Sequence, residues 1–433
     1  MNSQFSIPGT KECMLESTYW INKLEASDQL LMDKNAIEVF NKKTFKKVNT
    51  MCNIPEHKES LIREELHHSL EAYTIPTDIR YDIKGKEVEQ AFYNSIIQNS
   101  NLGEIQAINS VRFGIAIKNT RVRSFPTEEG IFKESSDIEF DRFQETECSA
   151  LDPVAILHES SDKDWFFIQM YNYTGWVKAC HIAIGKNKEE IFDYLNTDNF
   201  LMVTGDKVST QFNHYEERIS RRDFYMGTRI PLEIEPISQI GKQGSFLHHV
   251  VNLPVRDKEG FLEFKNALIS RREDVSLGYL PYTRATILNQ AFKLLGDRYD
   301  WGNKNYGRDC SSFLMYVYKT VGMILPRNGG DQEIGEGISY SFDKNATLEE
   351  RTRIFEKVKP GAAIFSPSHV MLYIGEDAGE HYMIHDFNSY GKLNQDGTLE
   401  KIYVNEIAVT STLLITSGGS KYIEVFTSLL EFE

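Results

Sequence analysis

Cysteine is scarce in this chain, and its spacing excludes the sites that paired cysteines usually build. Only five cysteines occur among 433 residues, and none stands in a Cys-x-x-Cys pair. An odd count also leaves at least one thiol outside any disulfide. We interpret four of the five as buried or incidental thiols, namely Cys13, Cys52, Cys148 and Cys180. Cys310 stands in a different pattern.

Long apolar runs are missing as well. No stretch approaches the ~18 apolar residues of a membrane-spanning helix. Residues Met1–Ser6 lack a basic region followed by an apolar one, so no signal peptide is visible. We therefore expect no membrane span. The protein is either cytoplasmic or, if the sequence begins after a removed leader, secreted or held in the cell envelope.

Basic residues are fewer than acidic ones. The chain has 48 Lys and Arg residues and 63 Asp and Glu residues, which gives a net charge of -15. This charge repels phosphate backbones and so disfavours nucleic-acid binding. It equally disfavours tight adhesion to anionic membranes or wall polymers. A peptide-sized or cationic substrate remains compatible with it, and we expect a monomer.

The metal-binding motif of zinc peptidases is not found. Residues 64–68 read Glu-Glu-Leu-His-His within a stretch of helical spacing. Adjacent histidines point about a quarter-turn apart on a helix, so they cannot share one ion as the two histidines of His-Glu-x-x-His do. We interpret His67 and His68 as solvated helix residues. No metal and no cofactor is expected.

The residues that are present describe a folded protein of several domains. Hydrophobic residues make up 41% and charged residues 26% of the chain, and its length suggests roughly three domains of ~150 residues. The first ~110 residues show mostly helical spacing. Asp33 precedes the apolar positions Ile37 and Phe40 and so predicts the N-cap of an amphipathic helix.

Short β-like runs, broken by Pro, Gly and Asp, begin near residue 111. They lie at 155–158, 165–170 and 175–177, and then at 200–203 and 225–232. Strands of this length and spacing favour small β-barrels. The Gly-Trp-Val at 175–177 resembles the closing strand of bacterial SH3-like domains. We place two barrels at 111–187 and 195–265.

The last ~155 residues carry the pattern with chemical meaning. Residues 283–295 have the spacing of a helix, and a second helical pattern runs from Phe313 to Val321. Asp309 then occupies the N-cap of the second helix and Cys310 its first turn. Unpaired N–H groups and the helix dipole stabilise a thiolate there, which predicts a thiol pKa below about 8.5. A cysteine serving as a small hydrophobe would lie on the apolar face, which Cys310 precedes.

A thiolate nucleophile needs an imidazole beside it. His369 opens a predicted buried strand at 370–375, although a structural histidine explains that position equally well. The next predicted strand, 381–385, ends in His385. On an antiparallel neighbour His385 would lie behind His369 and orient its ring, as the third member of a triad does. His381 faces the same side, and we prefer His385 because it lies nearer the start of the His369 strand.

Five motifs follow one another in the C-terminal third. They are Tyr-x-Trp-Gly at 299–302, Asp-Cys-Ser-Ser-Phe at 309–313, Leu-Pro-Arg at 325–327, Ser-His-Val-Met-Leu-Tyr-Ile-Gly at 368–375 and Ile-His at 384–385. In this order they resemble the NlpC/P60 family of cell-wall peptidases. Upstream, Tyr-Trp-Ile at 19–21 and the helical run at 35–41 resemble the N-terminal stabilising domain of members that also carry two SH3-like barrels.

The resemblance implies an α+β multi-domain fold. Its expected parts are a helical N-terminal domain at 1–110, the two SH3-like barrels and a papain-like NlpC/P60 catalytic domain at 279–433. It also implies a cysteine peptidase that hydrolyses the γ-D-glutamyl to diamino-acid bond of murein stem peptides.

The family pattern assigns roles residue by residue. Cys310 is the nucleophile, His369 its base, and His385 the residue that orients the base. Tyr299 matches a tyrosine whose hydroxyl helps to stabilise the oxyanion. One departure is Ser312, which stands where the family usually has glycine, a change that helical geometry tolerates.

The resemblance also bears on substrate choice. Asp309 and Ser311 match positions that flank the substrate in subfamilies that trim free peptides, although a capping role explains Asp309 equally well. In such relatives an SH3-like barrel closes the cleft at the substrate's N-terminal end, which implies a preference for short peptides with a free N-terminal L-Ala. A buried ammonium group needs a carboxylate partner. Candidates are the loop acids Glu128, Glu129, Asp162 and Asp164, for which a solvated position is an equal alternative.

Two other functions compete with this interpretation. An inactive binding module for wall peptides would have lost Cys310 or His369, and both are present. A papain-like amidase or acyltransferase acting on a non-murein substrate would use the same Cys–His chemistry. The murein-type upstream domains argue against that alternative.

Overall fold

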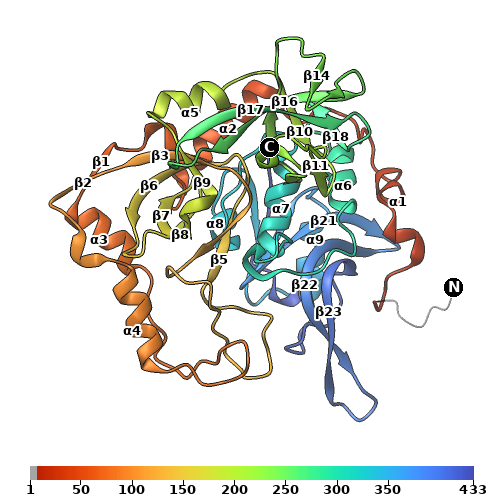
Figure 1. Ribbon diagram of the computed structural model, residues 1–433. Coiled ribbons are helices and arrows are strands. Elements are labelled where there is room, and N and C mark those ends of the chain that lie inside the picture. The colour runs from red at the N-terminus through yellow and green to blue at the C-terminus, as the bar shows by residue number, and fades with distance from the viewer. Residues whose placement is uncertain (1–6) are drawn as a thin grey trace. The chain divides into compact units, whose positions relative to one another are not determined.

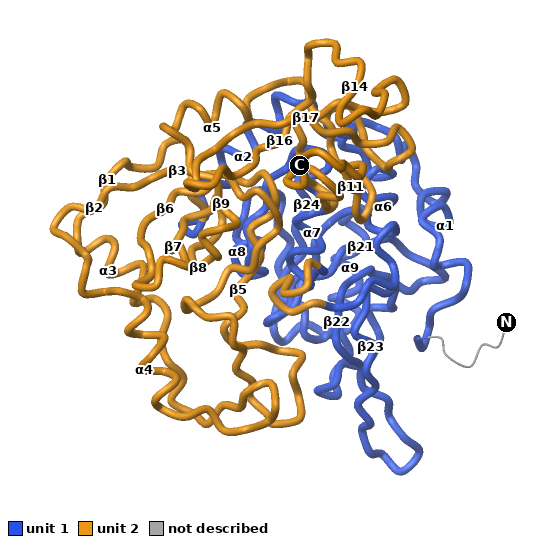
Figure 2. The backbone as a smooth tube through the Cα atoms, in the orientation of Figure 1, with its two compact units in different colours: residues 1–50, 279–299, 307–433 blue, residues 51–278, 300–306 orange. Residues whose placement is uncertain are grey.

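The computed structural model describes residues 7–433, so residues Met1–Ser6, in which no leader was found, lie outside it. The chain divides into two compact units (Figure 2). The first holds residues up to 50 together with 279–299 and 307–433, and the second holds 51–278 and 300–306. The expected N-terminal domain is therefore divided at residue 50. Throughout residues 7–433, every helix is too short or too polar to cross a membrane.

Short helices open the first unit. They are η2 (Glu12–Leu15), α1 (Ser17–Ile21) and α2 (Lys34–Lys47). The predicted N-cap of α2 is confirmed, because the Asp33 carboxylate accepts the backbone N–H of Ala36 at 2.8 Å. On α1, Trp20 is buried, and its ring lies 5.2 Å from that of Tyr382. This contact ties the N-terminal segment to the sheet of the same unit.

The first unit contains an antiparallel sheet of six strands, in the order β19-β24-β20-β21-β22-β23. Its strands β21, β22 and β23 are labelled in Figure 1. The strands are β19 (Ile338–Ser341), β20 (Ala363–Ser366), β21 (His369–Asp377), β22 (Glu380–Leu393), β23 (Leu399–Ser411) and β24 (Ser428–Glu431). The strands predicted at 370–375 and 381–385 are confirmed as parts of β21 and β22. Both strands continue beyond the predicted ends.

Helices flank this sheet. They are α6 (Arg284–Phe292), α7 (Cys310–Lys319), α8 (Gly329–Glu333), α9 (Leu348–Phe355) and α10 (Tyr422–Val425). The helix predicted at 283–295 is shorter, since Thr283 caps it and Lys293 ends it. Helix α7 packs against β21 and β22. Phe313, Leu314 and Val317 are fully buried in that contact face, as the helical spacing predicts.

The second unit begins with mixed structure. Its helices are α3 (Arg63–Glu71), α4 (Gln90–Asn99) and α5 (Lys188–Leu195), and β1 (Ser60–Ile62) pairs with β2 (Ile108–Ser110). Residues 64–68, which include His67 and His68, lie on helix α3, as expected. The region before residue 110 is thus not helical alone.

A seven-stranded sheet follows, in the order β5-β4-β8-β7-β6-β3-β9. Its strands are β3 (Arg112–Ala116), β4 (Thr120–Arg123), β5 (Gln144–Cys148), β6 (Pro153–Glu159), β7 (Trp165–Gln169), β8 (Thr174–Lys178) and β9 (Ile182–Ile184). The three predicted strands are confirmed as β6, β7 and β8. Their alternating apolar residues, with Trp165, Phe167 and Trp176 among them, are buried in one core.

The remaining strands of the second unit form small pairs and a triplet. They are β10 (Phe200–Val203), β11 (Lys207–Ser209), β12 (Asp223–Tyr225), β13 (Arg229–Pro231), β14 (Gln239–Ile240), β15 (Gln243–Gly244), β16 (His248–Arg256), β17 (Leu262–Ser270) and β18 (Val275–Leu277). The single strand predicted at 225–232 is wrong. Gly227, at φ +81°, turns the chain and separates β12 from β13. The second barrel at 195–265 stays a prediction.

Candidate active site

The start of helix α7 positions the sulfur of Cys310. Asp309 is the N-cap, and its carboxylate accepts the backbone N–H of Ser312 at 3.1 Å. In return the Ser312 hydroxyl accepts the backbone N–H of Asp309 at 2.9 Å. This reciprocal pair satisfies two amide groups at the helix start. Ser312, the departure from the family pattern, thus completes the cap of the helix that carries Cys310.

A buried ion pair holds the capping carboxylate. Both oxygens of Asp309 accept from the Arg327 guanidinium, at 3.1 and 2.6 Å, and Arg327 also donates to the Ser311 hydroxyl at 2.8 Å. Burial alone would raise the pKa of Asp309, but the charge and hydrogen bonds of Arg327 and the bonds from Ser312 hold it below its usual value. Asp309 and Ser311, predicted to flank substrate, therefore belong to one buried polar cluster.

The thiol of Cys310 differs from the prediction. Burial and then the neighbouring Asp309 carboxylate raise the pKa of Cys310 to about 12, and the backbone N–H of Val370 offsets this only in part. The expected lowered thiol pKa is wrong. The helix dipole favours a thiolate, but desolvation and a negative charge at the adjacent residue outweigh it. Burial and the Asp309 charge thus both favour the protonated thiol of Cys310 over its thiolate.

His369 and His385 form a direct pair. His369 is the first residue of β21, and its Nε2 lies 2.7 Å from Nδ1 of His385 on β22. Nε2 of His385 lies 2.9 Å from the Thr410 hydroxyl on β23. Burial lowers the pKa of His369 to about 4, although the Asp309 charge acts in the opposite direction. Burial and then the charge of His369 also lower the pKa of His385, so both rings are neutral at rest.

His381 lies elsewhere. Its Nδ1 lies 2.8 Å from the Tyr373 hydroxyl, and its ring stacks on Phe355 at a centroid distance of 4.7 Å. Of the two histidines on this part of β22, the structure brings His385 to His369. The alternative that placed His381 in the orienting role has no support in these contacts.

Tyr299 lies within the electrostatic reach of Cys310. Its backbone N–H donates to the Asn405 carbonyl on β23 at 2.9 Å. Burial, followed by the negative charges at Cys310, Asp309 and Asp386, raises the pKa of Tyr299. Its hydroxyl therefore keeps its proton and is a hydrogen-bond donor near the nucleophile.

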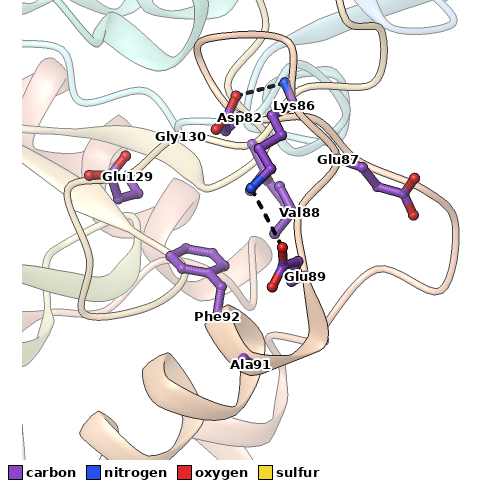
Figure 3. Close-up of a pocket in the computed structure, with 10 residues that line it drawn as sticks. Asp82, Lys86, Glu87, Val88, Glu89, Ala91, Phe92, Glu129 and Gly130 are labelled. Atoms are coloured by element: carbon purple, nitrogen blue, oxygen red, sulfur yellow. Dashed lines mark hydrogen bonds and ion pairs between the residues drawn. The ribbon is translucent and has the colours of Figure 1, made fainter.

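The loop acids lie in the second unit. Glu128 forms ion pairs with Arg121 at 3.5 Å and Lys178 at 4.0 Å. Glu129 lines a pocket of about 430 Å³, whose wall includes Phe92 and the Lys86–Glu89 ion pair (Figure 3). Asp162 accepts hydrogen bonds from Asn99, Ser160 and the Asp164 backbone and so stabilises its own loop.

Comparisons with known proteins match two segments of the chain to protein families. The model of the NlpC/P60 family matches residues 296–410, the segment that holds Tyr299, Cys310, His369 and His385. Residues 296–410 form an NlpC/P60 domain. This is a family of cysteine peptidases, so the chain carries a cysteine-peptidase domain. An SH3 domain of the SH3b1 type matches residues 130–178 in the second unit.

Two relatives place the NlpC/P60 domain in context. The γ-D-glutamyl-L-lysine dipeptidyl-peptidase of Bacillus cereus is 27% identical over 206 residues, which is 47% of this chain and 54% of that protein. The chain thus spans about half the length of this curated relative. The structure of an NlpC/P60 endopeptidase from Photobacterium damselae subsp. piscicida is similar at a TM-score of 0.77 and 19% identity, covering 96% of this chain and 97% of that chain. That similarity shows a shared fold.

Sequence reasoning assigned no role to several residues that lie near Asp309, His369 and His385. Arg327 was visible only as part of the Leu-Pro-Arg motif. Thr410 and Tyr422 come from distant elements, with the Tyr422 ring 5.3 Å from that of His385. No local pattern marks either residue, because a long-range contact brings each to the site.

The raised thiol pKa predicts slow alkylation of Cys310 at neutral pH. A thiol whose pKa lies at about 12 gains thiolate, and therefore reactivity, as the pH rises, so the rate should still climb between pH 7 and 10. Iodoacetamide labelling, quantified for each cysteine peptide by mass spectrometry, measures this rate. The exposed thiols of Cys13 and Cys180 serve as internal controls that react faster at pH 7. A fast, pH-independent rate at Cys310 from pH 5 to 8 would indicate a resting thiolate–imidazolium pair instead.

Proposed function

We propose that this protein is a cysteine endopeptidase that hydrolyses the γ-D-glutamyl to diamino-acid bond of murein stem peptides. The observation that carries the proposal is Cys310 at the first position of α7 in the same domain as the bonded pair of His369 and His385. The Bacillus cereus relative, named for a γ-D-glutamyl-L-lysine bond, supports the choice of bond. The SH3 and NlpC/P60 domains together support a role on wall peptides in the cell envelope.

The chemistry begins from neutral groups. Because Nε2 of His369 is engaged with His385, Nδ1 is the nitrogen that takes the thiol proton as the sulfur attacks the carbonyl carbon. The Tyr299 hydroxyl and nearby backbone N–H groups stabilise the oxyanion. Collapse of the intermediate breaks the C–N bond, and His369 returns the proton to the leaving amine. Water then hydrolyses the thioester with His369 again acting as base.

His385 makes this proton transfer easier. Once protonated, His369 donates through Nε2, and Nδ1 of His385 must be free of a proton to accept that bond. Burial favours this state because it lowers the pKa of His385 well below its usual value. The Thr410 hydroxyl oxygen then accepts a hydrogen bond from the N–H at Nε2 of His385. The pair therefore orients the base and disperses its charge.

The polar cluster beside the nucleophile remains our candidate for substrate contact. Asp309 is occupied as a cap and as the partner of Arg327, which favours its structural role. The Ser311 hydroxyl is bonded to both Asp309 and Arg327, at 3.3 and 2.8 Å. We assign the Ser311 hydroxyl to the wall of the substrate site, where the Arg327–Asp309 pair holds it in place.

Replacing Cys310 tests the nucleophile. The Cys310→Ala protein should lose hydrolysis of an L-Ala-γ-D-Glu-diamino-acid tripeptide, because no other group at the site forms the thioester. Liquid chromatography with mass spectrometry of the products measures the loss. Cys52→Ala, a half-buried thiol in the second unit, is the matched control and should turn over normally. Near-normal activity of Cys310→Ala would refute the mechanism.

Two histidine variants on β22 test the orienting role. His385→Ala should lower kcat by about a hundredfold with little change in KM, because the base loses its partner but the substrate site stays intact. His381→Ala removes another buried ring, whose hydrogen bond to Tyr373 does not involve His369, so it should retain most of kcat. Melting curves of both variants control for unfolding. An unchanged kcat for His385→Ala would transfer the role to another group.

The free-amine preference is tested with an acetylated twin of the tripeptide. We expect the free-amine peptide to be cleaved and both the N-acetylated peptide and intact murein to be poor substrates, because an ammonium partner would otherwise be left unpaired. Glu128→Gln and Glu129→Gln then show whether either loop acid contributes, through a raised KM for the free-amine peptide alone. Equal rates for the two peptides would remove the preference and leave the peptidase assignment standing.

A further inference from the structure

Residues 300–306, here called the tethered segment, belong to the second unit although both of their chain neighbours belong to the first. Within the second unit, three consecutive residues hold Trp301. The Phe140 ring lies edge-on at a centroid distance of 5.4 Å, the Arg142 guanidinium lies 5.4 Å from the Trp301 ring centre, and the Asp141 carbonyl accepts the indole N–H at 3.1 Å. Trp301 is thus fixed by aromatic, cationic and hydrogen-bond contacts at once.

The next residue is fixed through its backbone. The Gly302 carbonyl accepts from the side-chain amide of Gln144 at 2.8 Å, and the same amide donates to the Thr146 carbonyl at 2.7 Å. Gly302 has φ +61°, and a Cβ added there would lie 2.9 Å from Cγ of Gln144. Only glycine combines this conformation with this close approach.

Lys304 completes the attachment with charge. Its ammonium group lies 3.1 Å from the carboxylate of Asp141, and its carbonyl accepts from Arg121 at 2.9 Å. Asp141 is fully buried and also pairs with the fully buried Arg123 at 2.7 Å. Burial alone would raise the pKa of Asp141, but these two cations hold it below its usual value. Losing either cation leaves a buried carboxylate less well compensated.

The tethered segment is also internally rigid. The Asp300 carboxylate accepts both the backbone and the side-chain amide of Asn305, at 2.6 and 2.9 Å. The segment begins directly after Tyr299 and ends four residues before Cys310. The tethered segment thus makes up most of the loop between Tyr299 and Cys310. Holding it in place restrains the backbone next to both residues.

We propose that Asp141 and Gln144 of the SH3-like region, together with Trp301 and Lys304, position Tyr299 and Cys310 for attack by holding the tethered segment. None of these four acts on the substrate in this proposal; they are positioning residues. A displacement of about 1 Å at reacting atoms is enough to cost about a hundredfold in rate, so a lost attachment several residues away affects kcat. The inference rests on the proposed peptidase function only for its kinetic measurement.

Lys304 provides the sharpest test, because its removal leaves the Arg123–Asp141 pair in place. Lys304→Met should lower kcat on the tripeptide by about tenfold with KM within about twofold, and Lys304→Arg should restore most of kcat because it restores the cation. Lys186→Met, which removes an exposed lysine paired with Glu190 in the same unit, is the matched control and should behave as wild type. Gly302→Ala, which disturbs the attachment at a second point, should lower kcat in the same direction.

A substrate-free measurement separates this proposal from the proposed function. Cys310 is only partly exposed. Loosening the tethered segment should expose its thiol further, so iodoacetamide should label Cys310 at least about threefold faster in Lys304→Met than in wild type. If wild type fails to cleave the tripeptide, the proposed function fails while the labelling still tests the attachment. If Lys304→Met has the same kcat and the same Cys310 labelling rate as wild type, the positioning role is overturned. The positioning role would also be overturned if Lys304→Met and Lys304→Arg lost kcat equally and their melting temperatures fell by the same amount.

Discussion

The capping of α7 by Asp309, held by Arg327, is the constraint on which the catalytic unit depends. The carboxylate satisfies amides at the helix start and pairs with a buried guanidinium, so the first turn of α7 has one defined position. That position places the Cys310 sulfur near the backbone N–H of Val370, the residue that follows His369. The contact between α7 and β21 therefore determines the positions of both Cys310 and His369.

The same carboxylate also acts on the thiol of Cys310. Burial is the larger cause that raises the pKa of this thiol, and the negative charge of Asp309 raises it further, so the helix dipole does not prevail. Burial also keeps both histidines neutral. In the mechanism that we propose, charge separation occurs only once substrate is present, and the ordered polar groups around the pair then stabilise it.

Local features were predictable where local chemistry decides them. The Asp33 and Asp309 caps, the apolar face of α7 and the strands β6 to β8 follow from spacing alone. The thiol pKa was predicted with the wrong sign, because spacing shows a helix start but not how deeply it is buried. The break at Gly227 was missed for a related reason, since β-like residues on both sides mask a turn that one glycine produces.

Long-range contacts mark the limit of sequence reasoning within the motifs themselves. In Tyr-x-Trp-Gly the tyrosine lies near the nucleophile, whereas the tryptophan and glycine are held by residues 140–144, far away in sequence. The residues of one short motif therefore have two different surroundings. The tyrosine lies near Cys310, and the tryptophan and glycine contact residues 140–144, a difference that their spacing does not indicate. The glycine is explained by its positive φ and by the contact a Cβ would make, both of which exist only once the SH3-like region is folded. The tryptophan and glycine of this motif are thus explained by contacts within the folded second unit, which the spacing of the motif cannot show.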